Sequence, residues 1–244
     1  MEKEATINSH NTFAIGIDVG GTTVKGGIVG RSGAMSDRIK VDARGKEGPA
    51  VVIGVIRSVI DQLLASRNRA DCAGIGIGCP GIVSEDGDSV SHPPNLYGWE
   101  DVKLATELKK HFALPVVVEN DANSAALAEA TFGAGKEHKD FLFVIWGTGV
   151  GGGIVYNHKI FHGPHGGAGE IGHTSIDHNG PICNCGGRGC IESYIGQRYL
   201  SERARGRIKN EKDSILRKLV NGDLGKIEPA LIAAAAEQGD AAAK

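Results

Sequence analysis

The sequence predicts an α/β protein that is built as two lobes with a cleft between them. Strand patterns alternate with helical patterns along the chain, one strand-turn-strand segment recurs, and glycine-rich turns follow runs of β-branched residues. Alternation of this kind is typical of a parallel or mixed sheet that is covered by helices.

The first half of the chain carries these patterns in order. Residues 13–17 form an apolar run that leads through a glycine turn into a second strand. Apolar residues recur over 50–65 with the period of an amphipathic helix. The remaining segments are predicted as a strand over 73–78, a helix over 101–112, a strand over 114–118, a basic helical region over 191–220 and a last helix over 226–244. For the basic region, a solvated face is favoured over an anion site.

A comparison of the chain with itself indicates a duplication. GTTVKGGIV at 21–29 recurs as GTGVGGGIV at 147–155, and each copy follows an apolar run. We expect two related lobes, residues 1–118 and 119–244, with the two glycine turns facing each other across the cleft. Chance convergence of glycine-rich hairpins is the alternative explanation.

Composition excludes some classes of protein. The chain has 244 residues, of which 41% are hydrophobic, and 27 basic groups stand against 29 acidic ones. Such a balance argues against nucleic-acid binding through bulk charge. Because no apolar run approaches the roughly 20 residues of a membrane helix and residues 1–12 lack the apolar core of a signal peptide, we expect a cytoplasmic protein.

A cluster of cysteines predicts a metal site. Cys183, Cys185 and Cys190 lie within eight positions, with His173 and His178 upstream and glycines between the thiols. Three thiolates and one imidazole are a ligand set for tetrahedral Zn²⁺, and glycines let a short backbone aim several side chains at one point. The alternatives are buried free cysteines or a disulfide. Structural zinc is favoured, since two cysteines one residue apart bridge poorly and closely spaced Cys residues with a nearby His are typical of a zinc site.

The first glycine turn, over residues 18–25, has the composition of a phosphate site. Gly20, Gly21 and Thr22 offer backbone N–H groups beside Asp18 and Lys25. Glycines permit positive φ angles that aim successive amides at a phosphate, and a carboxylate can orient hydrated Mg²⁺. The order differs from that of a Walker A loop. Two such turns would cradle a nucleoside triphosphate from both sides.

Asp121 follows the strand over 115–118 and precedes a helix predicted over 123–132. Ligands of α/β proteins bind at the carboxyl ends of strands, where a carboxylate can accept the proton of an attacking alcohol. A helix N-cap is the alternative role for Asp121. Further polar residues suited to a polyhydroxylated substrate are Asn95, Asn120, Glu170, His173 and Glu192. Cys72 and Cys79 are expected in the core.

Seven motifs in this order resemble one known family. They are DVGGTTVKGG, GCPGIV, NLYGW, ENDAN, GTGVGGG, GEIGH and CNCGGRGCIE, and the resemblance extends from residue 15 to about residue 195. The chain resembles the ROK family of sugar kinases and repressors, within the actin-like ATPase superfamily. The match is specific because the cysteine motif and ENDAN occur together.

The resemblance implies two actin-like, ribonuclease-H-like lobes, structural zinc in the second lobe, and a homodimer that phosphorylates a hexose with ATP and Mg²⁺. Asp121 is then the catalytic base. The implied sugar contacts are Asn95, Asn120, Asp121, Glu170, His173 and Glu192. The implied nucleotide contacts are Asp18, Gly20, Gly21, Thr22, Lys25, Gly147, Thr148 and Gly149. The implied zinc ligands are His173, Cys183, Cys185 and Cys190, a choice of His173 over His178 that only the resemblance makes.

The sequence also departs from the family. Lys103 stands where a proline is usual, and the family's further glycine-rich strand and adenine-covering helices do not follow Gly225. We therefore expect either a fragment or impaired nucleotide binding. Glucose is the expected substrate, with an N-acetylhexosamine or fructose as alternatives and polyphosphate as an alternative donor. A sugar-responsive repressor or an inactive sugar-binding fragment is the competing function. Because only about a dozen residues precede Phe13, we expect no helix-turn-helix domain ahead of the first glycine turn.

Overall fold

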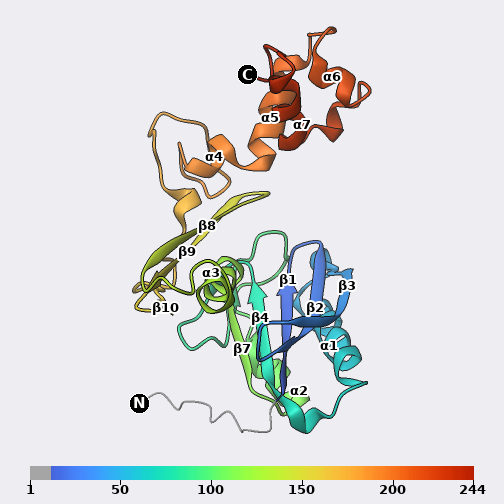
Figure 1. The fold of residues 1–244 in the computed structure, drawn as a ribbon, viewed down its shortest axis with the longest axis vertical. Helices are drawn as coiled ribbons and strands as arrows, with labels where there is room; N and C mark the ends of the chain where they lie inside the picture. Colours follow the sequence, from blue (N-terminus) through green and yellow to red (C-terminus); the bar gives the residue numbers. More distant parts are fainter. Residues whose placement is uncertain (1–11) are drawn as a thin grey trace. The chain divides into compact units, whose positions relative to one another are not determined.

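The computed structural model describes residues 12–244, and Figure 1 shows the fold. The expectations about a signal peptide and a helix-turn-helix domain concern mainly residues 1–11, which lie outside the described part. The chain divides into two compact units. The first contains residues up to Leu142 together with Gly153–Gly169, and the second contains Phe143–Gly152 and Glu170–Lys244. The lobe boundary expected near residue 119 stays a prediction.

A five-stranded mixed sheet forms the centre of the first unit, in the order β3-β2-β1-β4-β7. The strands are β1 (Phe13–Val19), β2 (Thr23–Gly30), β3 (Met35–Asp42), β4 (Cys72–Cys79) and β7 (Val116–Asn120). β1, β2 and β3 pair antiparallel, whereas β1, β4 and β7 run parallel. The mixed sheet confirms the prediction. Because β1, β4 and β7 are parallel, their carboxyl ends lie at the same edge of the sheet.

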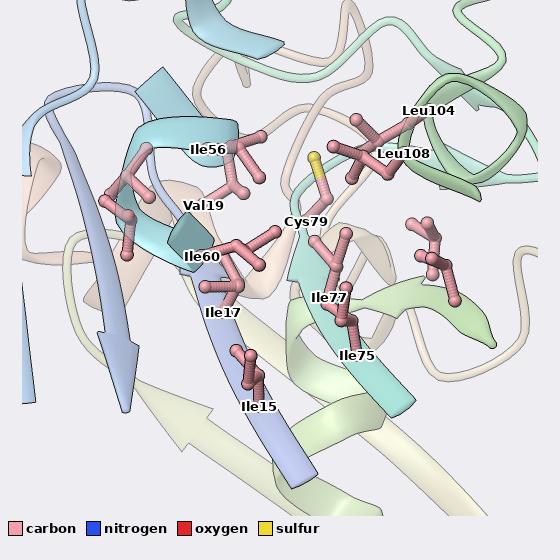
Figure 2. Close-up of a cluster of buried hydrophobic side chains, with 14 of the residues drawn as sticks. Ile15, Ile17, Val19, Ile56, Ile60, Ile75, Ile77, Cys79, Leu104 and Leu108 are labelled. Carbon is pink, nitrogen blue, oxygen red and sulfur yellow. The ribbon is translucent and has the colours of Figure 1, made fainter. Parts of the chain in front are cut away.

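Two helices cover one face of this sheet. They are α1 (Pro49–Leu64) and α2 (Leu104–Phe112). Figure 2 shows the side chains between them, with Ile15, Ile17 and Val19 from β1, Ile75, Ile77 and Cys79 from β4, Ile56 and Ile60 from α1, and Leu104 and Leu108 from α2. Burial of each such aliphatic side chain stabilises the fold by about 1.5–3 kcal/mol. Cys72 and Cys79 are both buried, as predicted.

The rest of the first unit consists of short elements and one further helix. They are η1 (Gly45–Glu47), η2 (Arg69–Asp71), β5 (Ile82–Val83), β6 (Val90–Ser91), α3 (Asp121–Phe132) and β10 (Lys159–Ile160). β5 pairs with β6, and β10 joins a three-stranded sheet in the order β10-β9-β8. The helix predicted from residue 101 begins only at Leu104, because residues 101–103 include a bridge between Val102 and Val90.

The hairpin of β8 (Phe141–Trp146) and β9 (Val150–Tyr156) contains the second copy of the repeated segment. The first copy lies in β1, the turn at residues 20–22 and β2. Both copies therefore form a strand, a glycine turn and a second strand, as predicted. The division between the two compact units passes through both strands of the second hairpin.

The second unit is mainly helical. Its elements after β9 are η3 (Ile171–His173), α4 (Ile191–Ile195), α5 (Gln197–Ile208), α6 (Ile215–Leu219), η4 (Leu224–Lys226) and α7 (Pro229–Glu237). Residues of α5, α6 and α7 share a separate apolar core that includes Ile208, Leu216 and Ala235. None of the helices in the described residues is long and apolar enough to span a bilayer.

The helical predictions for the second unit were too long. The region over 191–220 contains three helices, because Gly196 separates α4 from α5 and Ser214 begins a new helix as an N-cap that accepts from Arg217 N. The last helix starts at Pro229, where proline suits the first turn, and ends before Gly239, whose φ is 92°. Arg205 is not simply solvated, since its guanidinium donates to the carbonyl oxygens of Leu224 and Gly225.

Candidate functional site

The first glycine turn is shaped by a close contact and not by positive φ angles. Neither Gly20 nor Gly21 adopts a positive φ, so that part of the prediction was wrong. The Gly20 N–H already donates to Thr23 O at 2.8 Å. A Cβ added at Gly21 would lie 2.4 Å from Asn95 Cβ, a distance that side chains do not tolerate. The structure therefore brings two predicted site residues, Gly21 and Asn95, into direct contact.

Asp18 and Lys25 form an ion pair beside this turn. They are cross-strand partners in the β1–β2 ladder, and Lys25 Nζ lies 2.8 Å from Asp18 Oδ2. Both side chains are more than half exposed, and such a pair contributes at most about 1 kcal/mol to stability. Its charges are consequently available for a ligand at little cost to the fold.

Asn120, the last residue of β7, caps helix α3. Its Oδ1 accepts from the N–H groups of Ala122 and Asn123 at 2.9 and 3.2 Å, and its Nδ2 donates to Gly81 O. The alternative role considered for Asp121, that of N-cap, therefore belongs to Asn120. Asp121 is the first residue of the helix, at the sheet edge where β1, β4 and β7 end.

The environment of Asp121 makes its carboxylate a stronger base. Loss of solvation by the surrounding protein raises the pKa of Asp121, and the negative charge of Asp18 raises that pKa further. The N–H of Ala122, which donates to Asp121 Oδ1 at 2.8 Å, opposes the rise. Both carboxylates also affect Cys79. Burial is the main reason that the pKa of the Cys79 thiol is raised to about 12, and the charges of Asp121 and Asp18 also contribute to the rise. Asp18 and Asp121 thus act on the same small region.

A large cavity of about 1250 Å³ opens on the face of the sheet opposite α1 and α2. Glycines of three strands and apolar residues of α3 line it, among them Gly16, Gly27, Gly76, Leu127 and Phe132. Asp18 and Lys25 reach this cavity, but Asp121, Asn95 and Asn120 do not line it. Its size and apolar lining do not match a small polar ligand, whereas Asn120 and Asp121 lie outside it at the strand ends.

The second glycine turn, residues 147–149 between β8 and β9, packs against a carboxylate. A Cβ added at Gly149 would lie 2.3 Å from Glu192 Oε2. The same Oε2 accepts from Val150 N at 2.9 Å. Neither Gly147 nor Gly149 has a positive φ, as in the first turn. In the second unit, the structure therefore joins the predicted nucleotide turn to the predicted sugar ligand Glu192.

The cysteine motif gathers four side chains around one point. The ligand atoms of His173, Cys183, Cys185 and Cys190 all lie within 4.8 Å of one another. Cys185 Sγ is 3.7 Å from Cys190 Sγ, and Cys183 Sγ is 3.7 Å from His173 Nδ1. A tetrahedral ion with Zn–S bonds of about 2.3 Å holds its sulfurs about 3.8 Å apart. The spacing therefore fits zinc.

Glycines shape the loop that carries these cysteines. Gly186 and Gly189 have φ angles of 89° and 65°, which side-chain-bearing residues rarely adopt. A Cβ on Gly187 would lie 3.4 Å from the sulfurs of both Cys185 and Cys190, and one on Gly189 would collide with Asp177 O. A tight loop with this little space needs glycine at these positions.

The two nitrogens of His173 point to different partners. Nδ1 faces Cys183, while Nε2 lies 3.9 Å from Glu170 Oε2. A metal-bound imidazole usually turns its other nitrogen toward a carboxylate, which fixes the ring. His178 lies outside the cluster, since its Nε2 is 3.0 Å from Asn179 Nδ2. The geometry therefore favours His173, the ligand that spacing alone left open.

Comparison with known proteins gives a consistent result. Residues 14–244 match the ROK family. The chain is 40% identical to a glucokinase of Halalkalibacterium halodurans over 83% of this chain and 62% of that protein. It is 33% identical to the xylose repressor of Bacillus subtilis over 79% of this chain and 50% of the repressor. The chain thus spans about 62% of the length of the glucokinase and half that of the repressor.

A solved structure agrees with these relatives. A ROK family glucokinase from Streptomyces griseus, in complex with glucose and AMPPNP, superposes with a TM-score of 0.79 at 34% identity. The match covers 95% of this chain and 73% of that one. The family match covers nearly all described residues, and the structural match extends over 95% of this chain. This chain belongs to the ROK family.

Proposed function

We propose that this chain is the core of a hexose kinase that transfers the γ-phosphate of ATP to a sugar hydroxyl, with glucose as the substrate. The observation that carries the proposal is the setting of Asp121. Asp121 lies at the carboxyl end of the parallel strands, and Asn120, not Asp121, caps helix α3. The pKa of Asp121 is raised. Family membership and the glucose and AMPPNP bound to the Streptomyces griseus neighbour support the choice of substrates.

In the proposed mechanism, Asp121 accepts the proton of the attacking hydroxyl. A carboxylate with a raised pKa is better matched to this task near neutral pH, and general base catalysis contributes on the order of 10² to 10⁴ in rate. Asn95, Asn120, Glu170, His173 and Glu192 would hold the other hydroxyls through hydrogen bonds, so that a single hydroxyl meets the base. The N–H groups of the two glycine turns would bind the nucleotide phosphates.

Mg²⁺ would supply charge neutralisation at the phosphates when it is bound. Asp18 is the residue suited to orient it, because its carboxylate is exposed and adjoins the first turn. Lys25 would offset the charge of the phosphates from the same place.

We also propose that the protein is a homodimer, as the family resemblance implies. Sedimentation of the purified protein tests this proposal.

Substitution of Asp121 tests the proposed reaction. We expect Asp121→Asn and Asp121→Ala to lower kcat by about 10² or more, because the proton acceptor is lost, while sugar binding persists. A coupled assay measures turnover, and titration calorimetry measures the affinity for glucose. A residual rate above about a tenth of wild type would rule out Asp121 as the base. A panel with N-acetylmannosamine, N-acetylglucosamine and fructose, and with polyphosphate as donor, tests the substrates.

We also propose that His173, Cys183, Cys185 and Cys190 bind a structural zinc ion. The supporting observation is that sulfur and nitrogen atoms of these residues have the spacing of a tetrahedral site. Four protein ligands leave no open position for chemistry, so the ion would hold Glu170 and Glu192 in place. Metal analysis should find about one zinc per chain. Removal by a chelator should weaken sugar affinity before nucleotide affinity, and a protein without zinc after chelator-free purification would refute the assignment.

A sugar-responsive regulator is a second candidate function, because the Bacillus subtilis xylose repressor is 33% identical over 79% of this chain. An electrophoretic mobility shift with genomic DNA tests it, and binding that survives physiological salt would favour it.

A third candidate is a sugar-binding protein without kinase activity. Titration with glucose and with a non-hydrolysable ATP analogue distinguishes this case. Sugar binding without nucleotide binding would indicate a sugar-binding protein and not a kinase.

A further inference from the structure

His162, which follows β10, contacts the strand that leads to the proposed base. Its Nε2 lies 2.7 Å from Oε2 of Glu119, a residue of β7. An ionised carboxylate only accepts hydrogen bonds, so we assign His162 Nε2 as the donor in this contact. The side chain of Glu119 is 21% exposed, and that of His162 is 50% exposed. The contact therefore links a half-exposed imidazole to a less exposed carboxylate, and it joins segments that are 43 residues apart.

The other oxygen of Glu119 holds the turn around Asp121. Glu119 Oε1 accepts from the backbone N–H of Asn120 at 2.8 Å and from Asn123 Nδ2 at 3.1 Å. Asn120 is the cap that precedes Asp121, and Asn123 follows it in the first turn of α3. The orientation of the Glu119 carboxylate thus determines the contacts of Asn120, which precedes the proposed base, and of Asn123, which follows it.

Asn123 depends on this contact. Its side chain is 3% exposed, and its Oδ1 has no hydrogen-bond partner among the described residues. Gly153 of β9 presses against it, since a Cβ there would lie 3.2 Å from Asn123 Oδ1. The bond from Asn123 Nδ2 to Glu119 is consequently the polar contact that fixes this buried amide.

The loop that carries His162 is itself held at its base. Ala168 N donates to His162 O at 3.0 Å, which closes the segment between them. Gly163 and Gly166 within it have φ angles of 69° and 71°. The backbone of His162 is thus fixed by a hydrogen bond, and the ring is presented to Glu119 from an ordered position.

From these contacts we infer that His162 is a positioning residue for Asp121, which acts by fixing the Glu119 carboxylate. This inference rests on the proposed kinase function. Without the His162 donor, Glu119 Oε2 loses its hydrogen bond from the loop, and the carboxylate is free to turn away from Asn120 and Asn123. A shift of the first turn of α3 by a fraction of an ångström misaligns Asp121 with the sugar hydroxyl, and misplacement of about 1 Å can cost about 10²-fold in rate.

Three variants of the protein test the inference. His162→Leu removes the donor, whereas His162→Gln offers an amide N–H in its place. His165→Leu is the matched control, since His165 is exposed in the same loop and its ring makes no hydrogen bond within residues 12–244. We expect kcat to fall about tenfold in His162→Leu, with a clearly smaller change in the dissociation constant for glucose. His162→Gln should recover kcat to within about twofold, and the control should match wild type.

Two further measurements separate positioning from general damage. Glu119→Gln combined with His162→Leu should be no worse than the more impaired single variant, because both residues act through one network. NMR spectra should show displaced signals for the Asn120 amide and the Asn123 side-chain amide in His162→Leu, restored in His162→Gln. Thermal unfolding verifies that each variant folds.

The outcomes are distinguishable. A kcat of His162→Leu within about twofold of wild type, equal losses in His162→Leu and His162→Gln, or amide signals that do not move would each overturn the positioning role. A parallel loss of glucose affinity would do the same. If the wild-type protein transfers no phosphate, the proposed function fails, while the amide signals still decide whether His162 fixes the turn.

Discussion

The two copies of the glycine turn share their pattern but differ in chemistry. In the first copy, Gly21 packs directly against Asn95. A Cβ built on Gly147, its counterpart in the second copy, would have no atom of residues 12–244 within 4 Å. The second copy has its crowded position two residues later, at Gly149, which meets Glu192. The two copies of the repeated sequence thus pack against different residues, Asn95 in the first unit and Glu192 in the second.

The copies also differ in charge. The first contains the Asp18–Lys25 ion pair, while Val144 and Gly151 occupy the corresponding places in the second. The second turn obtains its charge from Glu192, which accepts from Val150 N. The repeated glycines therefore predict the shape of a turn, and the residues that differ determine what the turn can bind.

Alanine at the first position of the motif should give opposite results in the two copies. Gly21→Ala places a methyl group 2.4 Å from Asn95 Cβ, which is close to the backbone and cannot swing away. We expect a loss of about 1–3 kcal/mol in the free energy of unfolding, as for other overpacked sites. Gly147→Ala meets open space and should be tolerated. Chemical denaturation of both variants measures the difference, and equal losses would show that the turns are alike after all.

Gly149→Ala should affect ligand binding more than stability. Its methyl group would meet Glu192 Oε2, the end of a flexible side chain, which can move aside. Val150 N then loses its partner, at a cost of about 1 kcal/mol. If Glu192 contacts the sugar as proposed, glucose affinity should fall about tenfold, or about 1.4 kcal/mol. Calorimetry with Gly147→Ala as control measures this change. Unaltered affinity would separate Glu192 from the sugar site.

Much of the fold was predictable from the sequence. Short apolar runs located β1, β4 and β7, and a period-3.6 apolar pattern located α1, each to within two residues, because these elements bury side chains in a common core. The cysteine spacing likewise predicted a cluster that the structure assembles. Helix ends in the second unit were less predictable, since Gly196 and Ser214 interrupt a continuous polar pattern that has no strong apolar period.

The contacts that position Asp121 and raise its pKa could not be predicted from the sequence. Glu119 was visible within ENDAN, but its partner His162 lies 43 residues later in a loop without periodicity. The influence of Asp18 on Asp121 also depends on the parallel order of β1, β4 and β7, which brings distant strand ends to one edge. Spacing along the chain carries no information about such contacts, because they arise from sheet order.

The charge of the first turn provides the last and smallest test of the comparison. Because the negative charge of Asp18 raises the pKa of Asp121, Asp18→Asn should lower that pKa. The base must be ionised to accept a proton, so the acidic limb of the kcat profile should move to lower pH, even if the plateau rate falls. Loss of solvation, the larger cause of the raised pKa, remains, and the pKa of Asp121 should therefore stay above that of an ordinary aspartate.

Lys25→Gln is the matched control, since it removes the other member of the ion pair and keeps the charge of Asp18. We expect no downward shift in the pKa of Asp121 in this variant. NMR titration of the Asp121 carboxyl carbon measures the pKa directly and does not depend on turnover. If the pKa of Asp121 falls in both variants, the ion pair acts as a unit on the fold of the turn. If that pKa changes in neither variant, the difference in charge between the two turns does not affect the base.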